Sequence, residues 1–449
     1  MPLKRPVALS SALAVLCAGC LMNGRGRGIG EVLLGRLPEV PAVSLQPGPA
    51  GSAALAADTH PAAVTVSALA PDGKTRWAWR HDEGAAIGLE RDEPRLVRAP
   101  GGWYLVWMGN VTMGRRWEAQ FLSEDGKPAW PAPSRIGLLS TMETSFAACA
   151  GSDGSLFVAW TDNDRSAGSR FLVVAKVLRD GSVAWSKELG RQEKGWLLGP
   201  ALSPDLAGGA YLAFRHMDRG VMVHSFSTLG EPRWPEGLDL FDQGGYKTAP
   251  AMTADGAGGA IVLWEDGRNG TMDVYAQRVS ERGPLWKPEG VPVAKEDGNQ
   301  WTPQAAPDGQ GGAYALWIDD NKGSRWQVEL QRLDSEGRLQ LPLSGLVVSQ
   351  SSEKQYKPML AADGSGGAFV GWLENGYGQF QLLGQRFGAS GKRAWSETGA
   401  KAVDSAPFKD EPQIAPDGQG GLFFAWRSPE GAAWDVRAAR LDARGRPAW

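Results

Sequence analysis

The chain has 449 residues, of which 42% are hydrophobic and 20 are Trp, together with 60 Gly and 30 Pro. The aromatic content argues against a disordered chain, because so much apolar surface must be buried. The formal net charge of −3 argues against a nucleic-acid partner, which would require a clustered basic face.

The N-terminus predicts a signal peptide over residues 1–19. Lys4 and Arg5 precede an apolar run from Val7 to Leu16, and small residues follow before Cys20. The run is too short for a permanent membrane helix. The segment resembles a bacterial lipoprotein signal, in which a Leu usually lies three residues before the lipidated Cys. Here Leu16 lies one position before that place, which is occupied by Cys17. The resemblance implies that Cys20 is lipidated, and the alternative is an ordinary secretory signal.

The segment after Cys20 predicts a lipid-anchored flexible linker over residues 20–60, because it is rich in Gly, Pro and Ala. A short helix around Gly30 to Leu37 is compatible with this sequence. We expect the protein to be anchored at the cell envelope, on the periplasmic face of the outer membrane or at the cell surface. The remaining thiol, Cys149, cannot form an intramolecular disulfide and is expected to be buried.

From residue 61 onward the chain is dominated by an internal repeat. A glycine turn and an apolar run end in an aromatic residue seven times, at intervals of 50 to 55 residues. These aromatics are Trp107, Trp160, Phe214, Trp264, Trp317, Trp372 and Trp426.

Each repeat contains four short runs with period-two alternation, separated by Gly, Asp and Pro. This pattern indicates four β-strands, and four strands in about 53 residues are typical of a β-propeller blade. We therefore predict an all-β fold with a single propeller over residues 61–449. A solenoid is disfavoured because β-helix coils are shorter and an open array would leave sheet edges to cap.

The number of blades depends on which signal is counted. The aromatic after the glycine turn occurs seven times, whereas a second element, a Gly turn leading to Trp, occurs eight times, with Leu341 replacing Trp once. We predict seven blades, with eight as the alternative. The strand near Val64 to Leu69 is expected to complete the final blade.

The fullest repeat, Asp255 to Val279, resembles the propeller-type repeats of secreted and surface proteins of bacteria. The resemblance covers roughly residues 60–449. It implies an architecture and leaves function open, because propellers include enzymes, lectins and scaffolds.

The repeat also explains two sequence motifs that could be mistaken for ligand-binding or catalytic sites. The sequence DGQGG, beginning at Asp308 and Asp417, lacks the following Lys and helix of a phosphate loop and recurs where each blade needs a turn. Four arginines recur in the third strand and are expected to pair within the blade: Arg278, Arg332, Arg386 and Arg440. The sequence contains no HExxH, nucleophile elbow or zinc-type Cys/His cluster, so we assign no catalytic residue, metal or cofactor.

Ligand-binding candidates lie in loops on the face where second strands end and first strands begin. The second-strand loops contribute Arg215, His216, Asp218, Arg219, Asp266, Arg268 and Asp319. The loops entering the first strands contribute Tyr246, Trp301 and Tyr356, and lysines follow aromatics at Tyr246-Lys247, Tyr356-Lys357 and Phe408-Lys409. Aromatic rings beside charged groups could bind a sugar or a peptide, but capping and core packing would also use these residues.

We expect an exported, monomeric, lipid-anchored propeller that acts as a non-enzymatic binding or assembly module. Its partners would be the membrane, through the anchor, and a glycan or a protein or peptide ligand. The alternative is a polysaccharide-active hydrolase or lyase with its site in the propeller funnel.

Overall fold

The computed structural model describes residues 32–37, 43–59, 63–82, 94–111, 114–139, 145–164, 169–190, 197–241, 246–320, 325–376, 379–403, 409–431 and 433–449. The predicted signal peptide and Cys20 lie outside these residues. Within the described parts of the chain, no helix has the length and apolar character needed to cross a membrane.

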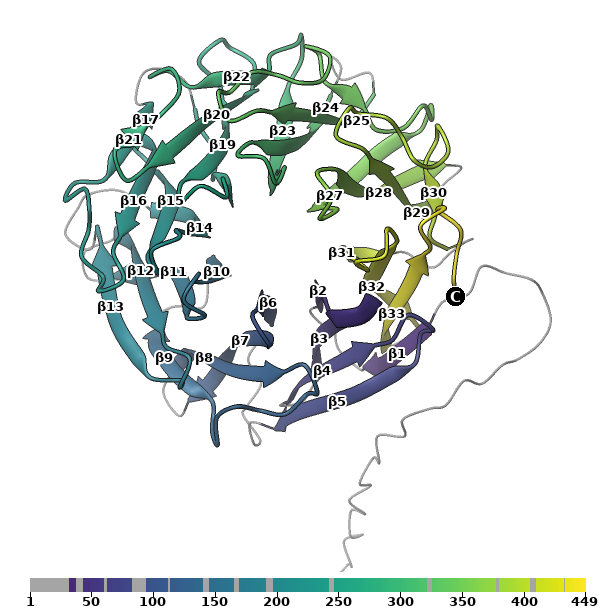
Figure 1. The fold of residues 1–449 in the computed structure, drawn as a ribbon, viewed down its shortest axis with the longest axis horizontal. Helices are drawn as coiled ribbons and strands as arrows, with labels where there is room; N and C mark the ends of the chain where they lie inside the picture. Colours follow the sequence, from purple (N-terminus) through teal and green to yellow (C-terminus); the bar gives the residue numbers. More distant parts are fainter. Residues whose placement is uncertain are drawn as a thin grey trace, which may run out of the picture.

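The described residues form eight antiparallel sheets arranged in a ring around a central axis (Figure 1). From the axis outward, blade 1 contains β2 (Val43–Pro47), β3 (Ala53–Thr59), β4 (Ala63–Leu69) and β5 (Thr75–Asp82). Blade 2 contains β6 (Arg95–Ala99), β7 (Gly102–Val111), β8 (Gly114–Ser123) and β9 (Ser134–Leu139). Blades 3 and 4 contain β10 (Phe146–Ala150), β11 (Leu156–Asp164), β12 (Ser169–Val177) and β13 (Val183–Leu189), then β14 (Leu197–Pro204), β15 (Ala210–His216), β16 (Gly220–Phe226) and β17 (Leu238–Phe241). A 3-10 turn, η1 (Pro49–Gly51), connects β2 to β3.

The second half of the ring continues this order. Blades 5 and 6 contain β18 (Ala251–Ala254), β19 (Ala260–Asp266) and β20 (Asp273–Ser280), with β21 (Gly283–Pro284) and β22 (Val291–Ala294) both paired to β20, then β23 (Gln300–Pro307), β24 (Ala313–Asp319), β25 (Gln327–Leu333) and β26 (Leu346–Val347). Blades 7 and 8 contain β27 (Lys354–Ala362), β28 (Ala368–Gly376), β29 (Gln379–Phe387) and β30 (Ala400–Lys401), then β31 (Asp410–Pro416), β32 (Leu422–Glu430), β33 (Ala433–Leu441) and β1 (Val32–Leu37).

The all-β propeller expected from the sequence is confirmed, but the preference for seven blades was wrong. Blade 1 escaped the aromatic count because its second strand, Ala53–Thr59, contains no aromatic residue and its preceding turn lacks the Asp-Gly sequence. The eight Gly-turn-Trp elements gave the correct number.

The closing strand was also misassigned. Val64 to Leu69 lies within β4 of blade 1, and the final blade is completed by β1, whose Val32–Leu37 pairs antiparallel with β33 (Figure 1). Strands β1, β2 and β3 therefore occupy part of the range 20–60 for which a linker was expected. Residues 32–37 form a strand rather than the suggested helix.

Apolar side chains from neighbouring sheets meet to form the core between blades. The aromatics that close the second strands are almost completely buried, as Trp264 and Trp317 illustrate. In contrast, the innermost strands carry small residues such as Ala251, Thr253 and Ala254 of β18. This distribution follows from the geometry, because the sheets converge toward the central axis and diverge toward the outside.

In blades 3 to 8, an aspartate organises the turn between the first and second strands. In blade 6, Asp308 Oδ1 accepts hydrogen bonds from the backbone N–H groups of Gln310 and Gly312, both at 2.8 Å. Asp308 Oδ2 accepts from Arg332 Nη2 at 2.9 Å. Gly312 is required here, because a Cβ at this position would lie 1.9 Å from the Leu333 carbonyl oxygen.

The same ion pair recurs around the ring. The pairs are Asp153–Lys176, Asp205–Arg233, Asp255–Arg278, Asp308–Arg332, Asp363–Arg386 and Asp417–Arg440. The structural role expected for the four repeated arginines is therefore confirmed.

The cation of this pair also reaches the next blade. Arg332 Nη1 donates to the Ala389 carbonyl at 3.2 Å, and Arg440 Nη1 donates to Pro71 at 3.1 Å, across the closure between blades 8 and 1. Trp449 Nε1 donates to the same Pro71 oxygen at 2.7 Å. The ring is therefore closed both by β1 and by side chains at the end of the chain.

Replacing Arg332 with Met should lower the free energy of unfolding by about 3 kcal/mol, because the buried Asp308 carboxylate would lose its countercharge. Urea denaturation measures this change. Arg338→Met, which removes an exposed partner of Asp334, is the matched control and should have little effect. Equal stability of the two variants would contradict a role for the buried pair in holding the ring.

Removing residues 1–41 should expose the outer edge of β33, since β1 is its partner there. We expect the amides of Ala433–Leu441 to lose protection in hydrogen exchange, whereas those of β29, which keeps β30, should not. Unchanged protection of β33 would show that β1 does not contribute to closure.

Candidate functional site

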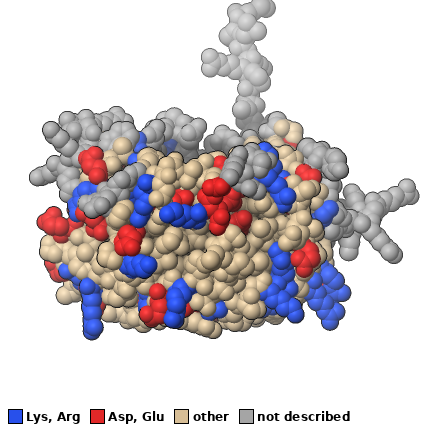
Figure 2. Space-filling view, turned by 90° about the horizontal axis from the view of Figure 1, so that it is seen from above, with Lys and Arg blue, Asp and Glu red and all other residues tan. Residues whose placement is uncertain are grey.

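The two faces of the ring carry different kinds of connection. Turns between first and second strands and between third and fourth strands lie on one face, which holds the Asp–cation pairs. Connections between second and third strands and between blades lie on the other face, which we call the rim face. Both acidic and basic side chains are present on the edge of the ring visible in Figure 2.

The blade 4 candidates on the rim face are largely engaged in local structure. His216 is buried, and its Nδ1 accepts hydrogen bonds from the backbone N–H groups of Asp218 and Arg219 at 3.1 and 3.2 Å. Arg219 forms an ion pair with Asp239 at 2.9 Å. His216 thus acts as a cap for the turn between β15 and β16.

Arg215 and Tyr246 are brought together from blades 4 and 5. The Arg215 guanidinium lies 4.3 Å from the centre of the Tyr246 ring, and its Nη1 donates to the Tyr246 hydroxyl at 3.2 Å. Tyr246 is 59% exposed. This pair is a small surface feature on the rim face.

Asp266 and Arg268 form a buried contact inside blade 5. Asp266 is fully buried and accepts hydrogen bonds from Trp264 Nε1 at 2.9 Å and from the Arg268 guanidinium. Burial opposes ionisation, but these hydrogen bonds hold the pKa of Asp266 below its usual value. Arg268 in turn lies 3.7 Å from the Phe241 ring centre and 3.9 Å from that of Tyr275. Both groups are therefore committed to the core of the blade.

Asp319 belongs to a buried acidic cluster in blade 6. Gln300 Nε2 donates to Asp319 Oδ2 at 3.1 Å. Glu329, in the neighbouring strand β25, is also buried, and this burial together with the negative charges of Asp319 and Glu296 raises its pKa to about 8. The described parts of the chain contain no group of three or more His, Cys, Asp and Glu placed to hold a metal ion.

Trp301 and Tyr356 lie in one row of ring contacts with Trp326 and Phe380, two aromatic residues that were not among the candidates from the sequence. The ring centres of Trp301 and Trp326 are 5.5 Å apart, those of Trp326 and Tyr356 are 5.3 Å apart, and those of Tyr356 and Phe380 are 5.8 Å apart. All four side chains are partly exposed. We call Trp301, Trp326, Tyr356 and Phe380 the aromatic row.

The repeat contained a signal for the two missed residues. Trp326 and Phe380 lie six residues before Arg332 and Arg386, at the entry to the third strand. The same position holds Met272 in blade 5 and Trp434 in blade 8. Aligning the repeats on the structural arginines, rather than on the glycine turns, would have identified this position.

A backbone bulge shapes the innermost strands beside the aromatic row. Thr302, Lys357 and Glu411 have φ angles of 52°, 45° and 43°, and each directly precedes a proline. The strand register shifts at each of these positions. Bulges and left-handed non-glycine residues concentrate at functional sites, where they redirect side chains.

The lysines of the entering loops fall into two different environments. Lys247 and Lys409 lie three residues before the strand proline and are buried, whereas Lys357 lies directly before Pro358 and is 48% exposed. Phe408 lies outside the described residues. Similar dipeptides in the sequence thus occupy different positions, and only Lys357 of these three lies at the surface.

Lys357 takes part in an ionic network that links blades 7 and 8. Its Nζ lies 2.7 Å from Asp410 Oδ1, and Arg427 Nη2 lies 2.8 Å from both Asp410 Oδ2 and Glu411 Oε1. Burial opposes ionisation of Asp410, but Lys357 and Arg427 hold its pKa below the usual value. The network contains two positive and two negative groups.

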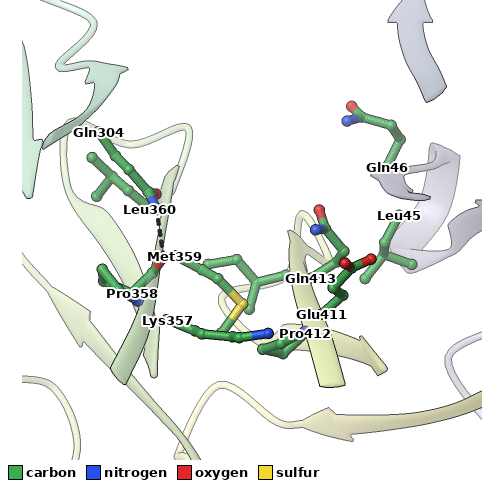
Figure 3. Close-up of a pocket in the computed structure, with 11 residues that line it drawn as sticks. Leu45, Gln46, Gln304, Lys357, Pro358, Met359, Leu360, Glu411, Pro412 and Gln413 are labelled. Atoms are coloured by element: carbon green, nitrogen blue, oxygen red, sulfur yellow. Dashed lines mark hydrogen bonds between the residues drawn. The ribbon is translucent and has the colours of Figure 1, made fainter. Parts of the chain in front are cut away.

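A cavity of about 460 Å³ opens beside this network, on the inner strands of blades 1, 6, 7 and 8 (Figure 3). Lys357 and Glu411 border it, and the amides of Gln46, Gln304 and Gln413 add polar groups. The remaining lining residues are Leu45, Pro358, Met359, Leu360, Pro412 and Ile414.

Glu329→Gln should stabilise the protein at pH 8 by roughly 4 kcal/mol. The carboxyl has a usual pKa of 4.5 and a folded-state pKa of about 8, so only the folded state keeps the proton between these values. Wild-type stability should therefore fall as pH rises through this range. Urea denaturation at pH 4 and pH 8 tests this, with little difference expected at pH 4. An equal effect at both pH values would contradict the raised pKa.

No protein-family model and none of the curated protein sequences compared matches the chain. Among solved structures, it is similar to a polysaccharide lyase, an ulvan lyase of family PL25, at 12% identity, with 78% of this chain and 91% of the other covered and a TM-score of 0.46. It is also similar to a protein of unknown function from Dyadobacter fermentans, at 12% identity and a TM-score of 0.40, with 92% of this chain and 98% of the other covered. The propeller domain of the trilobed protease from Pyrococcus furiosus is similar at 10% identity and a TM-score of 0.44, with 79% of this chain and 94% of the other covered. These similarities concern the fold alone.

Proposed function

We propose that the protein is a non-enzymatic binding module whose ligand site comprises the aromatic row and the adjoining cavity. The observation that carries this proposal is the row of four partly exposed rings on the rim face of blades 6 and 7. Exposed aromatic side chains beside polar groups are suited to binding, because they offer apolar area with little conformational entropy to lose.

The pairing of the charged groups favours binding over catalysis. His216 caps a turn, Asp266 bonds to Arg268, and Asp410 is held by Lys357 and Arg427. A general acid or base needs to be free to reach a substrate proton. The second candidate, a polysaccharide-active hydrolase or lyase, would have to use titratable groups other than these.

We further propose that the protein is exported and anchored to the cell envelope through lipid at Cys20. The support is the signal-like sequence described above, in which a basic start and an apolar run precede this cysteine. Metabolic labelling with palmitate should label the wild-type chain and not a Cys20→Ala variant. Labelling that persists in the variant would refute the anchor.

Binding can be tested with arrays of glycans and peptides, using the Cys20→Ser chain to avoid lipidation. A Trp301→Ala/Tyr356→Ala variant should bind its array ligand at least about tenfold more weakly, because buried aromatic contacts dominate binding energy. Leu343→Ala, which alters an exposed residue on the opposite face, should bind normally.

Two outcomes would contradict the binding proposal. Binding of an array ligand that is unaffected in the Trp301→Ala/Tyr356→Ala variant would place the site elsewhere. Cleavage of an array glycan by the wild-type chain would favour the enzymatic candidate.

A further inference from the structure

The aromatic row is accompanied by two exposed lysines of the same strand. Lys354 and Lys357 lie on either side of Tyr356 in β27, and both are exposed. Lys354 Nζ lies 5.7 Å from the centre of the Trp326 ring. Lys357 is held near the row by its ion pair with Asp410. The site thus combines aromatic surface with two ammonium groups, of which that of Lys357 is already paired with a carboxylate.

The rings of the row are turned relative to one another. The interplanar angle is 59° between Trp301 and Trp326, 65° between Trp326 and Tyr356, and 72° between Tyr356 and Phe380. The row therefore presents a series of small facets rather than one flat surface. A chain of rigid, ring-shaped units can place the C–H face of successive units against such facets, which a single planar ligand cannot do.

The charges beside the row indicate which kind of chain would fit. A neutral sugar chain could only accept hydrogen bonds from the ammonium groups of Lys354 and Lys357, whereas a sugar carrying a carboxylate could form the stronger, charge-assisted bonds with them. Lys357 is already paired with a carboxylate, that of Asp410, so a ligand carboxylate has to compete for this ammonium group. A ligand carboxylate could share or replace this contact while Arg427 continues to hold Asp410.

We propose that the ligand is an acidic polysaccharide, a chain containing uronic acid units that packs on the aromatic row and directs carboxylates to Lys354 and Lys357. This inference rests on the proposed binding function and adds the chemical class of the ligand to it. The facets favour this occupant over a peptide, because a peptide backbone has no repeating rings to pack against them.

The probe for this proposal is polygalacturonate, compared with its fully methyl-esterified form, which keeps the sugar rings and removes the charge. Binding to the Cys20→Ser chain is followed by affinity electrophoresis and by tryptophan fluorescence. We expect the acid to bind roughly tenfold more tightly than the ester, and this preference to shrink at high salt. Lys354→Met/Lys357→Met should abolish the preference, and Trp326→Ala should weaken binding of both forms.

The matched control is Lys74→Met/Lys127→Met, which removes two lysines with side chains 75% and 80% exposed on the opposite face. It should bind polygalacturonate as the wild type does. Equal loss in this control would show that binding reflects net charge only and would overturn the proposal.

Other outcomes separate this proposal from the binding function beneath it. One such outcome is equal binding of the acid and the ester, and another is binding of array peptides instead of the polysaccharide. If that binding is lost in Trp326→Ala, the acidic ligand is refuted and the aromatic row is kept as a binding site. Polygalacturonate binding that is unaffected by both Trp326→Ala and the double lysine change would refute both proposals.

Discussion

The fold depends on one repeated contact, the buried pair between a turn aspartate and a cation of the same blade. The aspartate satisfies backbone N–H groups of its own turn, and in several blades the cation that neutralises it also reaches a carbonyl of the next blade, as Arg332 does with Ala389. One charged group therefore fixes a turn, joins two strands and holds neighbouring sheets together. Because breaking such a pair leaves a buried charge, each position tolerates little change.

This arrangement places different structural constraints on the two faces of the ring. Turns and side-chain contacts between blades fix one face, so the loops of the rim face are free to vary between blades. Bulges before Pro303, Pro358 and Pro412 shift the register of the innermost strands in blades 6 to 8, and a similar shift occurs beside Pro200 in blade 4. The aromatic row, the ionic network and the cavity all lie beside the bulges of blades 6 to 8.

Repetition determined how much could be predicted from sequence. The propeller, its strands and the structural arginines were predictable, because the same physical requirement recurs in each blade. Blade 1 was missed because its second strand packs with alanines instead of a terminal aromatic. Within the site, Trp301 and Tyr356 were identified from their loops, but Trp326 was not, because it lies at the start of a third strand. Lys357 directly precedes a proline and is exposed, whereas Lys247 and Lys409 lie three residues before one and are buried. The aromatic-Lys dipeptides alone do not show this difference.

The central claim is that ligand binds on the rim face of blades 6 to 8 rather than elsewhere on a nearly symmetric ring. Hydroxyl-radical footprinting of the Cys20→Ser chain, with and without polygalacturonate, tests it most directly. We predict protection of Trp301, Trp326 and Tyr356 on addition of the polysaccharide, with no change at Trp77 or Trp185, which contact the next blade near the opposite face. Protection at Trp77 or Trp185 with none in the aromatic row would contradict the claim.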